Sequence, residues 1–110
     1  MYDGLWTVEF ISTIQRYGNG VLVLSQNRLL GGDAGYYYSG KYDINDKKIE
    51  GDIHITRYDR NSVSVLGNIS DFVLKMSGNI IDENRFEAIG ETDNNPKARI
   101  QIIGTKKEDL

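Results

Sequence analysis

The sequence predicts an all-β domain, a small antiparallel up-and-down β-barrel of about eight strands. Apolar residues alternate with a period of two, turn-forming residues recur at hairpin spacing, and no window has the apolar period of a helix. The 110 residues are expected to form one domain, 1–110, near the commonest domain size. A hydrophobic fraction of 39% suffices for one core.

The alternation is clearest between Lys48 and Tyr58. Ile49, Ile53 and Ile55 fall on one face of this predicted strand and polar residues on the other, so one face is buried and one is solvated. The same alternation puts further inner positions at Trp6, Val8, Phe10, Tyr36, Tyr38, Gly40, Tyr42, Ile44, Phe72, Leu74, Met76, Gly78, Ile80, Phe86, Ala88, Gly90, Ala98, Ile100 and Ile102. It fades within 60–70, where we expect one helical turn.

Turn signals separate the strands. Gly, Asn and Asp supply the positive φ of tight hairpins. They occur at 18–20, 26–27, 31–33, 45–46, 59–61, 82–84 and 93–96, where the sole proline, Pro96, ends the last group. Connections this short favour a sequential meander, and closure into a barrel removes the exposed edge strands. A sandwich of two sheets is the alternative.

Composition argues against several function classes. The net charge is -3 and the basic residues are dispersed, so we expect no direct contact with nucleic acid. There is no cysteine for disulfides, thiol catalysis or a cysteine metal site. The N-terminus carries Asp3 where a secretory signal carries basic residues, and no apolar run approaches the ~18 residues of a membrane span. We expect a cytoplasmic, bacterial protein that does not bind membranes.

The chemistry-bearing residues form no catalytic or metal-binding set. His54 is the only histidine and lies on a polar strand face beside Asp52, where a solvated surface role is the simplest interpretation. The glycine-rich stretch 31–35 precedes a strand and not a helix, so it is a turn and not a phosphate loop. Spaced carboxylates such as Glu50 and Asp52 lie on wet faces. We expect no enzyme, no cofactor and no metal.

Inward aromatic residues admit two interpretations. They either line a ligand cavity, with phenol hydroxyls as polar anchors, or form packed core. Arg57 follows the inner set of its strand and lies either at the barrel mouth or inside, where it could bind a ligand carboxylate. The cavity candidates are Trp6, Tyr36, Tyr38, Tyr42, Arg57 and Phe72.

Apolar residues on the predicted outer face indicate a possible interface. A closed barrel brings the last strand beside the first, and an exposed apolar stripe there would serve self-association or partner binding. The interface candidates are Leu5, Leu22, Leu24, Val73, Ile89 and Ile103, with Ile11 and Ile81 nearby. The alternatives are that some strands face the other way or that a terminal segment covers the stripe.

The span from Gly4 to Tyr58 resembles the GrlR-like negative regulators of type III secretion. The likeness rests on DGLWTVEF at 3–10, GVLV at 20–23, GGD at 31–33 with Tyr38 and Gly40 downstream, and IHITRY at 53–58. The resemblance implies a lipocalin-like barrel that forms a homodimer and acts by binding a protein. The best-known member of that family sequesters a transcriptional activator and does no chemistry.

The resemblance also implies a partner-binding loop. The family carries an acidic EDED run between two central strands, and this chain has DINDKK at 43–48, where the acidic residues are interrupted and two lysines follow. The candidate loop residues are therefore Asp43, Asn45 and Asp46. The alternative function is a carrier of a small apolar or amphipathic ligand inside the barrel.

Overall fold

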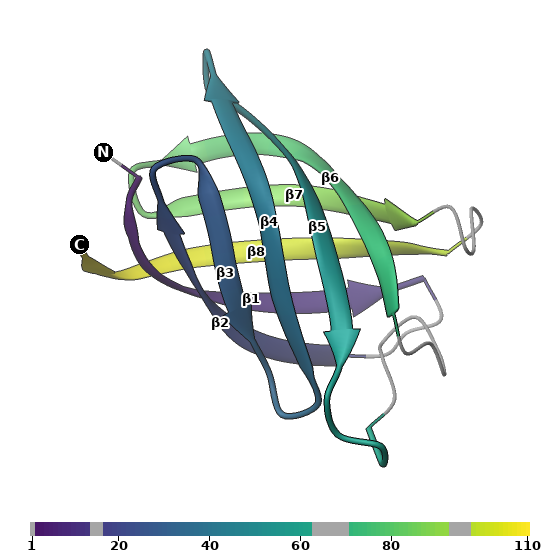
Figure 1. The fold of residues 1–110 in the computed structure, drawn as a ribbon. Coiled ribbons are helices and arrows are strands. Elements are labelled where there is room, and N and C mark those ends of the chain that lie inside the picture. The colour runs from purple at the N-terminus through teal and green to yellow at the C-terminus, as the bar shows by residue number, and fades with distance from the viewer. Residues whose placement is uncertain (1, 14–16, 63–70, 93–97) are drawn as a thin grey trace.

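Eight antiparallel strands follow one another in chain order around a closed barrel (Figure 1). The computed structural model describes residues 2–13, 17–62, 71–92 and 98–110. The predicted all-β up-and-down barrel is confirmed. The sandwich alternative is wrong, because a single sheet closes on itself.

The strands differ in length and are joined by short connections. They are β1 (Gly4–Ser12), β2 (Tyr17–Ser25), β3 (Arg28–Gly32), β4 (Tyr36–Asn45), β5 (Lys48–Arg57), β6 (Asp71–Asp82), β7 (Arg85–Thr92) and β8 (Arg99–Asp109). The β2–β3 turn has φ of 51° at Gln26 and 67° at Asn27, and the β4–β5 turn has 53° at Asp46 and 66° at Lys47. Two successive positive φ values match the twist of tight hairpins. The second turn lies one residue later than predicted.

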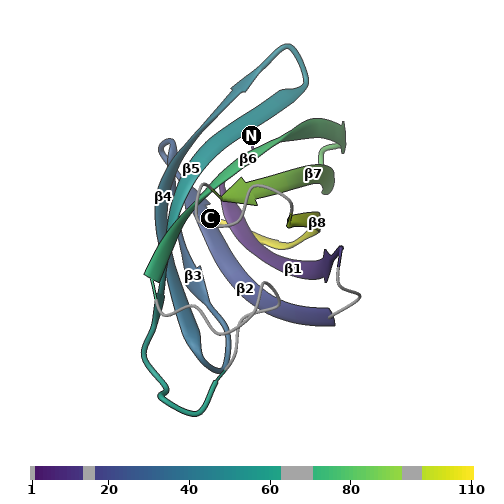
Figure 2. The same cartoon turned by 90° about the vertical axis from the view of Figure 1, so that its right-hand side faces the viewer.

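Closure comes from the pairing of the first strand with the last. Val8 lies opposite Gly20 of β2 on one side and opposite Gly104 of β8 on the other. Both sides of β1 are thus hydrogen-bonded, and the barrel has no exposed edge there. Figure 2 shows the curved strands enclosing one interior.

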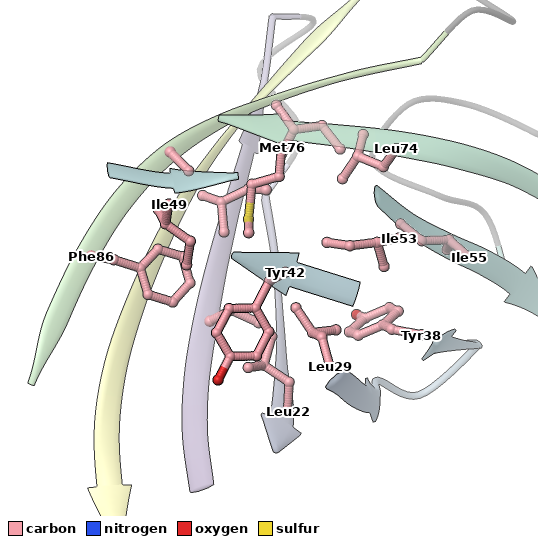
Figure 3. Close-up of a cluster of buried hydrophobic side chains, with 14 of the residues drawn as sticks. Leu22, Leu29, Tyr38, Tyr42, Ile49, Ile53, Ile55, Leu74, Met76 and Phe86 are labelled. Carbon is pink, nitrogen blue, oxygen red and sulfur yellow. The ribbon is translucent and has the colours of Figure 1, made fainter. Parts of the chain in front are cut away.

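The interior is filled by the alternating apolar residues. Ile49, Ile53 and Ile55 are at most 8% exposed, as their alternation predicts, and Trp6 and Val8 are fully buried. Side chains from opposite walls converge on this core (Figure 3). The rings of Trp6 and Phe86, from β1 and β7, lie with their centroids 5.3 Å apart. Burial of this apolar set is the main stabilising contribution to the fold.

Leu22 and Leu24 face the core, so their prediction as outer interface residues is wrong. They are 4% and 1% exposed, and the register places them opposite Trp6 and Gly4. Directly opposed residues of an antiparallel pair share one face of the sheet. The error has a physical reason: residues 21–24 read VLVL, so both faces of this stretch are apolar and alternation cannot distinguish them. Figure 3 shows Leu22 beside Leu29 in the interior.

Close strand approach explains the inward glycine at position 78. A Cβ there would lie 2.1 Å from the carbonyl oxygen of Glu87 and 2.4 Å from Cα of Ala88. Those atoms belong to the backbone of β7 and cannot move aside without disturbing the pairing. Glycine at 78 therefore allows β6 and β7 to curve tightly together.

Two predicted features fall outside the described residues. Most of the helical turn expected within 60–70 and the turn that contains Pro96 lie in 63–70 and 93–97. In the described part of the chain, no helix is long and apolar enough to cross a membrane.

The same substitution at a buried and an exposed position tests the core. Ile49 is fully buried and Ile81 is 52% exposed. We expect Ile49→Ala to lower the free energy of unfolding by about 2–5 kcal/mol, because it removes buried methyl groups and leaves a cavity. We expect Ile81→Ala to change it by less than about 0.5 kcal/mol. Urea denaturation measures both, and equal effects would contradict the assignment of inner and outer faces.

Candidate functional site

One end of the barrel is filled and closed by the N-terminal residues. The indole N–H of Trp6 donates to the carbonyl of Tyr2 at 2.9 Å. The hydroxyl of Tyr42 donates to Asp3 Oδ1 at 3.3 Å, and the backbone N–H of Gln26 donates to Oδ2 of the same carboxylate at 3.3 Å. Burial, and then the charge of Asp3, raise the pKa of Tyr42 to about 12, so the phenol stays a neutral donor at physiological pH.

The other end of the barrel contains a cavity of about 300 Å³. This volume is at the lower end of the ~300–1,000 Å³ range of small-molecule pockets. Its walls come from the ends of β1, β2 and β8, from the β3–β4 turn, and from β4 to β6. The lining residues are Phe10, Tyr17, Gly18, Asn19, Asp33, Ala34, Gly35, Tyr36, Tyr38, Ile55, Ser62, Phe72, Leu74 and Ile100.

The six predicted cavity residues divide between the two ends. Tyr36, Tyr38 and Phe72 line the cavity. Trp6 and Tyr42 do not, because their positions along β1 and β4 place them at the filled end, where they are packed core. Arg57 does not line the cavity either. It lies beside it at the end of β5, opposite Tyr36, and its Nη1 donates to the carbonyl of Ser62 at 3.3 Å.

Asp33 is the polar centre of the cavity. Its Oδ1 accepts the backbone N–H groups of Gly35 and Tyr36, both at 2.9 Å, and its Oδ2 accepts the hydroxyl of Tyr38. The hydroxyl of Tyr58 donates to its backbone carbonyl. An aspartate that accepts backbone N–H groups two and three residues ahead stabilises a tight turn. Sequence analysis identified this turn but missed the carboxylate as a site residue.

The described lining of the cavity carries one charged side chain, the carboxylate of Asp33, and Arg57 lies beside the cavity at Ser62. Of the described lining residues, Asp33 is the only Asp or Glu and none is Lys or Arg. The ion pairs formed among the described residues do not include it. Burial, followed by the hydrogen bond to Asp33 and its negative charge, raises the pKa of Tyr38 far above its ordinary value. Tyr38 therefore remains a protonated donor to a carboxylate.

Aromatic rings line the same cavity as the carboxylate. The rings of Phe10 and Tyr38 meet edge to face, with centroids 5.9 Å apart and planes at 88°. Tyr36 and the exposed Tyr17 also line the cavity. Four apolar side chains, Ile55, Phe72, Leu74 and Ile100, also line the cavity, and we call them its floor. The lining of the cavity therefore combines one carboxylate, several aromatic rings and an apolar floor.

A second surface feature is an apolar patch on the outside of β1 to β4. Leu5 lies opposite Val23, which lies opposite Leu30, and Val21 and Tyr37 flank Gly32 in the next row. We call these five residues, Leu5, Val21, Val23, Leu30 and Tyr37, the outer patch. All but the half-buried Val23 are at least 39% exposed.

The remaining interface candidates do not form the stripe expected across the last strands. Val73 is exposed and lies opposite His54 on β5. Ile89 is exposed between Ser77 and Gln101, whereas Ile103 is half-buried between Glu87 and Glu9. Polar neighbours thus separate Val73 from the other two. Only Leu5 of the predicted set belongs to the outer patch.

The β4–β5 hairpin carries the predicted partner-binding residues. It projects beyond the neighbouring turns (Figures 1 and 2). Asp43 lies directly opposite Glu50, and Asn45 lies opposite Lys48, with Asp46 in the turn. Directly opposed like charges destabilise a strand pair. None of the described ion pairs includes Asp43, Asp46 or Glu50. The side-chain amide of Asn27 donates a hydrogen bond to Asp43 at 3.2 Å.

His54 pairs with a carboxylate that sequence analysis did not consider. Its Nε2 contacts Oδ1 of Asp71 on the neighbouring strand β6, and not Asp52 on its own strand. Both side chains are more than half exposed, which agrees with a surface histidine. Among the residues that the structure describes, no group of three or more His, Cys, Asp or Glu could hold a metal ion.

Comparison with known proteins supports the fold. No protein-family model matches the chain, and no curated protein matches it. Among solved structures, the chain is similar to a redesigned β-barrel with a TM-score of 0.71, over 97% of this chain and 92% of that chain. The identity is 14%, so this likeness shows a shared barrel fold and nothing about function.

Substitutions at Asp33 test its role in the β3–β4 turn. We expect Asp33→Ala to lower the free energy of unfolding by about 1–3 kcal/mol, because two backbone N–H groups and Tyr38 lose their acceptor. Asp33→Asn should cost less, since an amide oxygen still accepts the N–H groups and an amide N–H can donate to Tyr38. Chemical denaturation compares the two variants, and equal losses would contradict this hydrogen-bonding role.

Proposed function

We propose that the protein is a non-enzymatic regulator of the GrlR-like type, which acts by binding and sequestering a transcriptional activator. The resemblance of Gly4 to Tyr58 to that family motivates this function. The observation that carries it is the projecting β4–β5 hairpin, where Asp43 and Glu50 face the solvent side by side.

Carboxylates on a projecting hairpin that form no described ion pair suit a basic partner. Two opposed acidic side chains cost stability in the free protein, and a cationic surface would relieve this repulsion on binding. The DNA-binding surface of an activator is such a surface, because it is built to contact phosphates. Lys47 and Lys48 lie next to the carboxylates, so the hairpin also presents positive charge that restricts which basic partner fits.

The outer patch supports self-association. Its members lie on adjacent strands and form one contiguous apolar face. Contiguous exposed apolar surface commonly marks a protein interface, and a twofold dimer needs only one such self-complementary face. We therefore assign the dimer contact to the outer patch and the partner contact to the hairpin.

Charge removal at the hairpin tests partner binding. The purified transcriptional activator encoded nearest to this gene serves as the partner in isothermal titration calorimetry. We expect Asp43→Asn with Glu50→Gln to weaken binding about tenfold, the equivalent of about 1.4 kcal/mol. The matched control, Asp82→Asn with Glu83→Gln, removes the same charge at the β6–β7 turn and should leave affinity unchanged. Equal affinity of all three proteins would refute the hairpin assignment.

A charge placed in the outer patch tests the dimer. Leu30 and Val73 are similarly exposed, at 43% and 48%, but only Leu30 belongs to the patch. We expect the wild type and Val73→Lys to be dimers at micromolar concentration and Leu30→Lys to be a monomer, because the buried lysine would lack a partner. Light scattering after gel filtration measures the mass. A monomeric wild type would end the dimer assignment.

A second candidate function is a carrier of a small apolar or amphipathic ligand. The cavity of about 300 Å³ at the open end of the barrel favours it. Eight-stranded barrels of this kind are wide enough to hold one small ligand. The two functions are compatible, since the cavity and the hairpin lie at opposite ends of the barrel.

A further inference from the structure

We infer that the cavity binds small amphipathic ammonium cations, with the ammonium group at Asp33 and the apolar part on the floor. This inference rests on the second candidate function, that the cavity holds a small ligand. It adds the sign of the ligand charge and the orientation of the ligand.

The charge of the ligand follows from the charge of the lining. Asp33 is the sole Asp or Glu among the described lining residues, which include no Lys or Arg. A carboxylate at the mouth of a partly desolvated cavity attracts a cation more strongly than it would in water. The same carboxylate repels an anion, so a fatty acid is a poor ligand for this cavity.

Asp33 keeps capacity for a ligand hydrogen bond. It accepts two backbone N–H groups at Oδ1 and the Tyr38 hydroxyl at Oδ2. An ionised carboxylate offers about four lone-pair sites, so about one remains. These three protein donors also fix its orientation, which lowers the entropic cost of binding. An ammonium N–H can therefore bind a preorganised acceptor.

The aromatic residues reinforce the preference for a cation. Phe10, Tyr36 and Tyr38 line the same cavity as the carboxylate, and the hydroxyl of Tyr38 binds it. The faces of aromatic rings attract ammonium groups within about 6 Å of the ring centroid. The pKa of Tyr38 is raised, which keeps this ring neutral and its hydroxyl bound to Asp33.

The floor selects for an apolar tail. Ile55, Phe72, Leu74 and Ile100 line the cavity and offer no ionisable group. A volume of about 300 Å³ admits a short alkyl or single-ring group and excludes large lipids. Octylammonium, octanol and octanoate share one tail and differ in head group, so they separate apolar binding from charge recognition.

The experiment is calorimetric titration of these three compounds into the wild type, Asp33→Asn and Asp52→Asn at neutral pH. We expect the wild type to bind octylammonium about tenfold more tightly than octanol, with octanoate weakest. Asp33→Asn should lose this tenfold preference and keep its affinity for octanol. Asp52→Asn, which removes an exposed carboxylate outside the cavity, should behave as the wild type.

The other possible results of these titrations distinguish failure of the charge inference from failure of the carrier function. If octanol and octylammonium bind the wild type equally, the charge inference is overturned and the carrier function stands. If none of the three binds, the carrier function fails and the inference fails with it. If the Asp33→Asn protein is too unstable to titrate, the affinities of the wild type for octylammonium and octanol are measured at increasing salt concentration instead. Raising ionic strength should weaken octylammonium and leave octanol unchanged, and equal salt dependence would overturn the inference.

Discussion

All nine residues of β1, from Gly4 to Ser12, pair with β8, and this pairing turns a sheet into a barrel. It gives every strand two hydrogen-bonded neighbours and divides the side chains into an inner and an outer set. The core, the cavity, the outer patch and the outward carboxylates all depend on that division. An open sheet with the same alternation would leave β1 and β8 exposed to other chains.

The two ends of the barrel use this interior differently. At one end, Trp6 and Phe86 fill the space, and hydrogen bonds to Tyr2 and Asp3 close it. At the other end, the interior is hollow and its polar centre, Asp33, belongs to the turn that joins β3 to β4. The hollow end can therefore hold a carboxylate that the packed interior could not. This asymmetry is what makes a ligand site compatible with so short a chain.

The sequence predicted the barrel and most of its core, because polar and apolar residues contrast clearly at positions such as 48–57. It failed where that contrast is absent, as at 21–24, and so assigned Leu22 and Leu24 to the wrong face. The sequence also could not predict features that depend on the register between strands. The opposition of Asp43 and Glu50 requires the turn at 46–47, one residue later than expected, and the bond from Tyr38 to Asp33 requires the geometry of the β3–β4 turn.

Amide hydrogen exchange, followed by NMR, tests the closed barrel most directly. In a closed barrel, consecutive amides along β1 and β8 are all hydrogen-bonded, to one neighbouring strand or the other. Slow exchange of both Thr7 and Val8 in β1, and of both Ile103 and Gly104 in β8, is therefore predicted, comparable with exchange in β5. Fast exchange at every second amide of β1 and β8 would mark two open edges and would contradict this account.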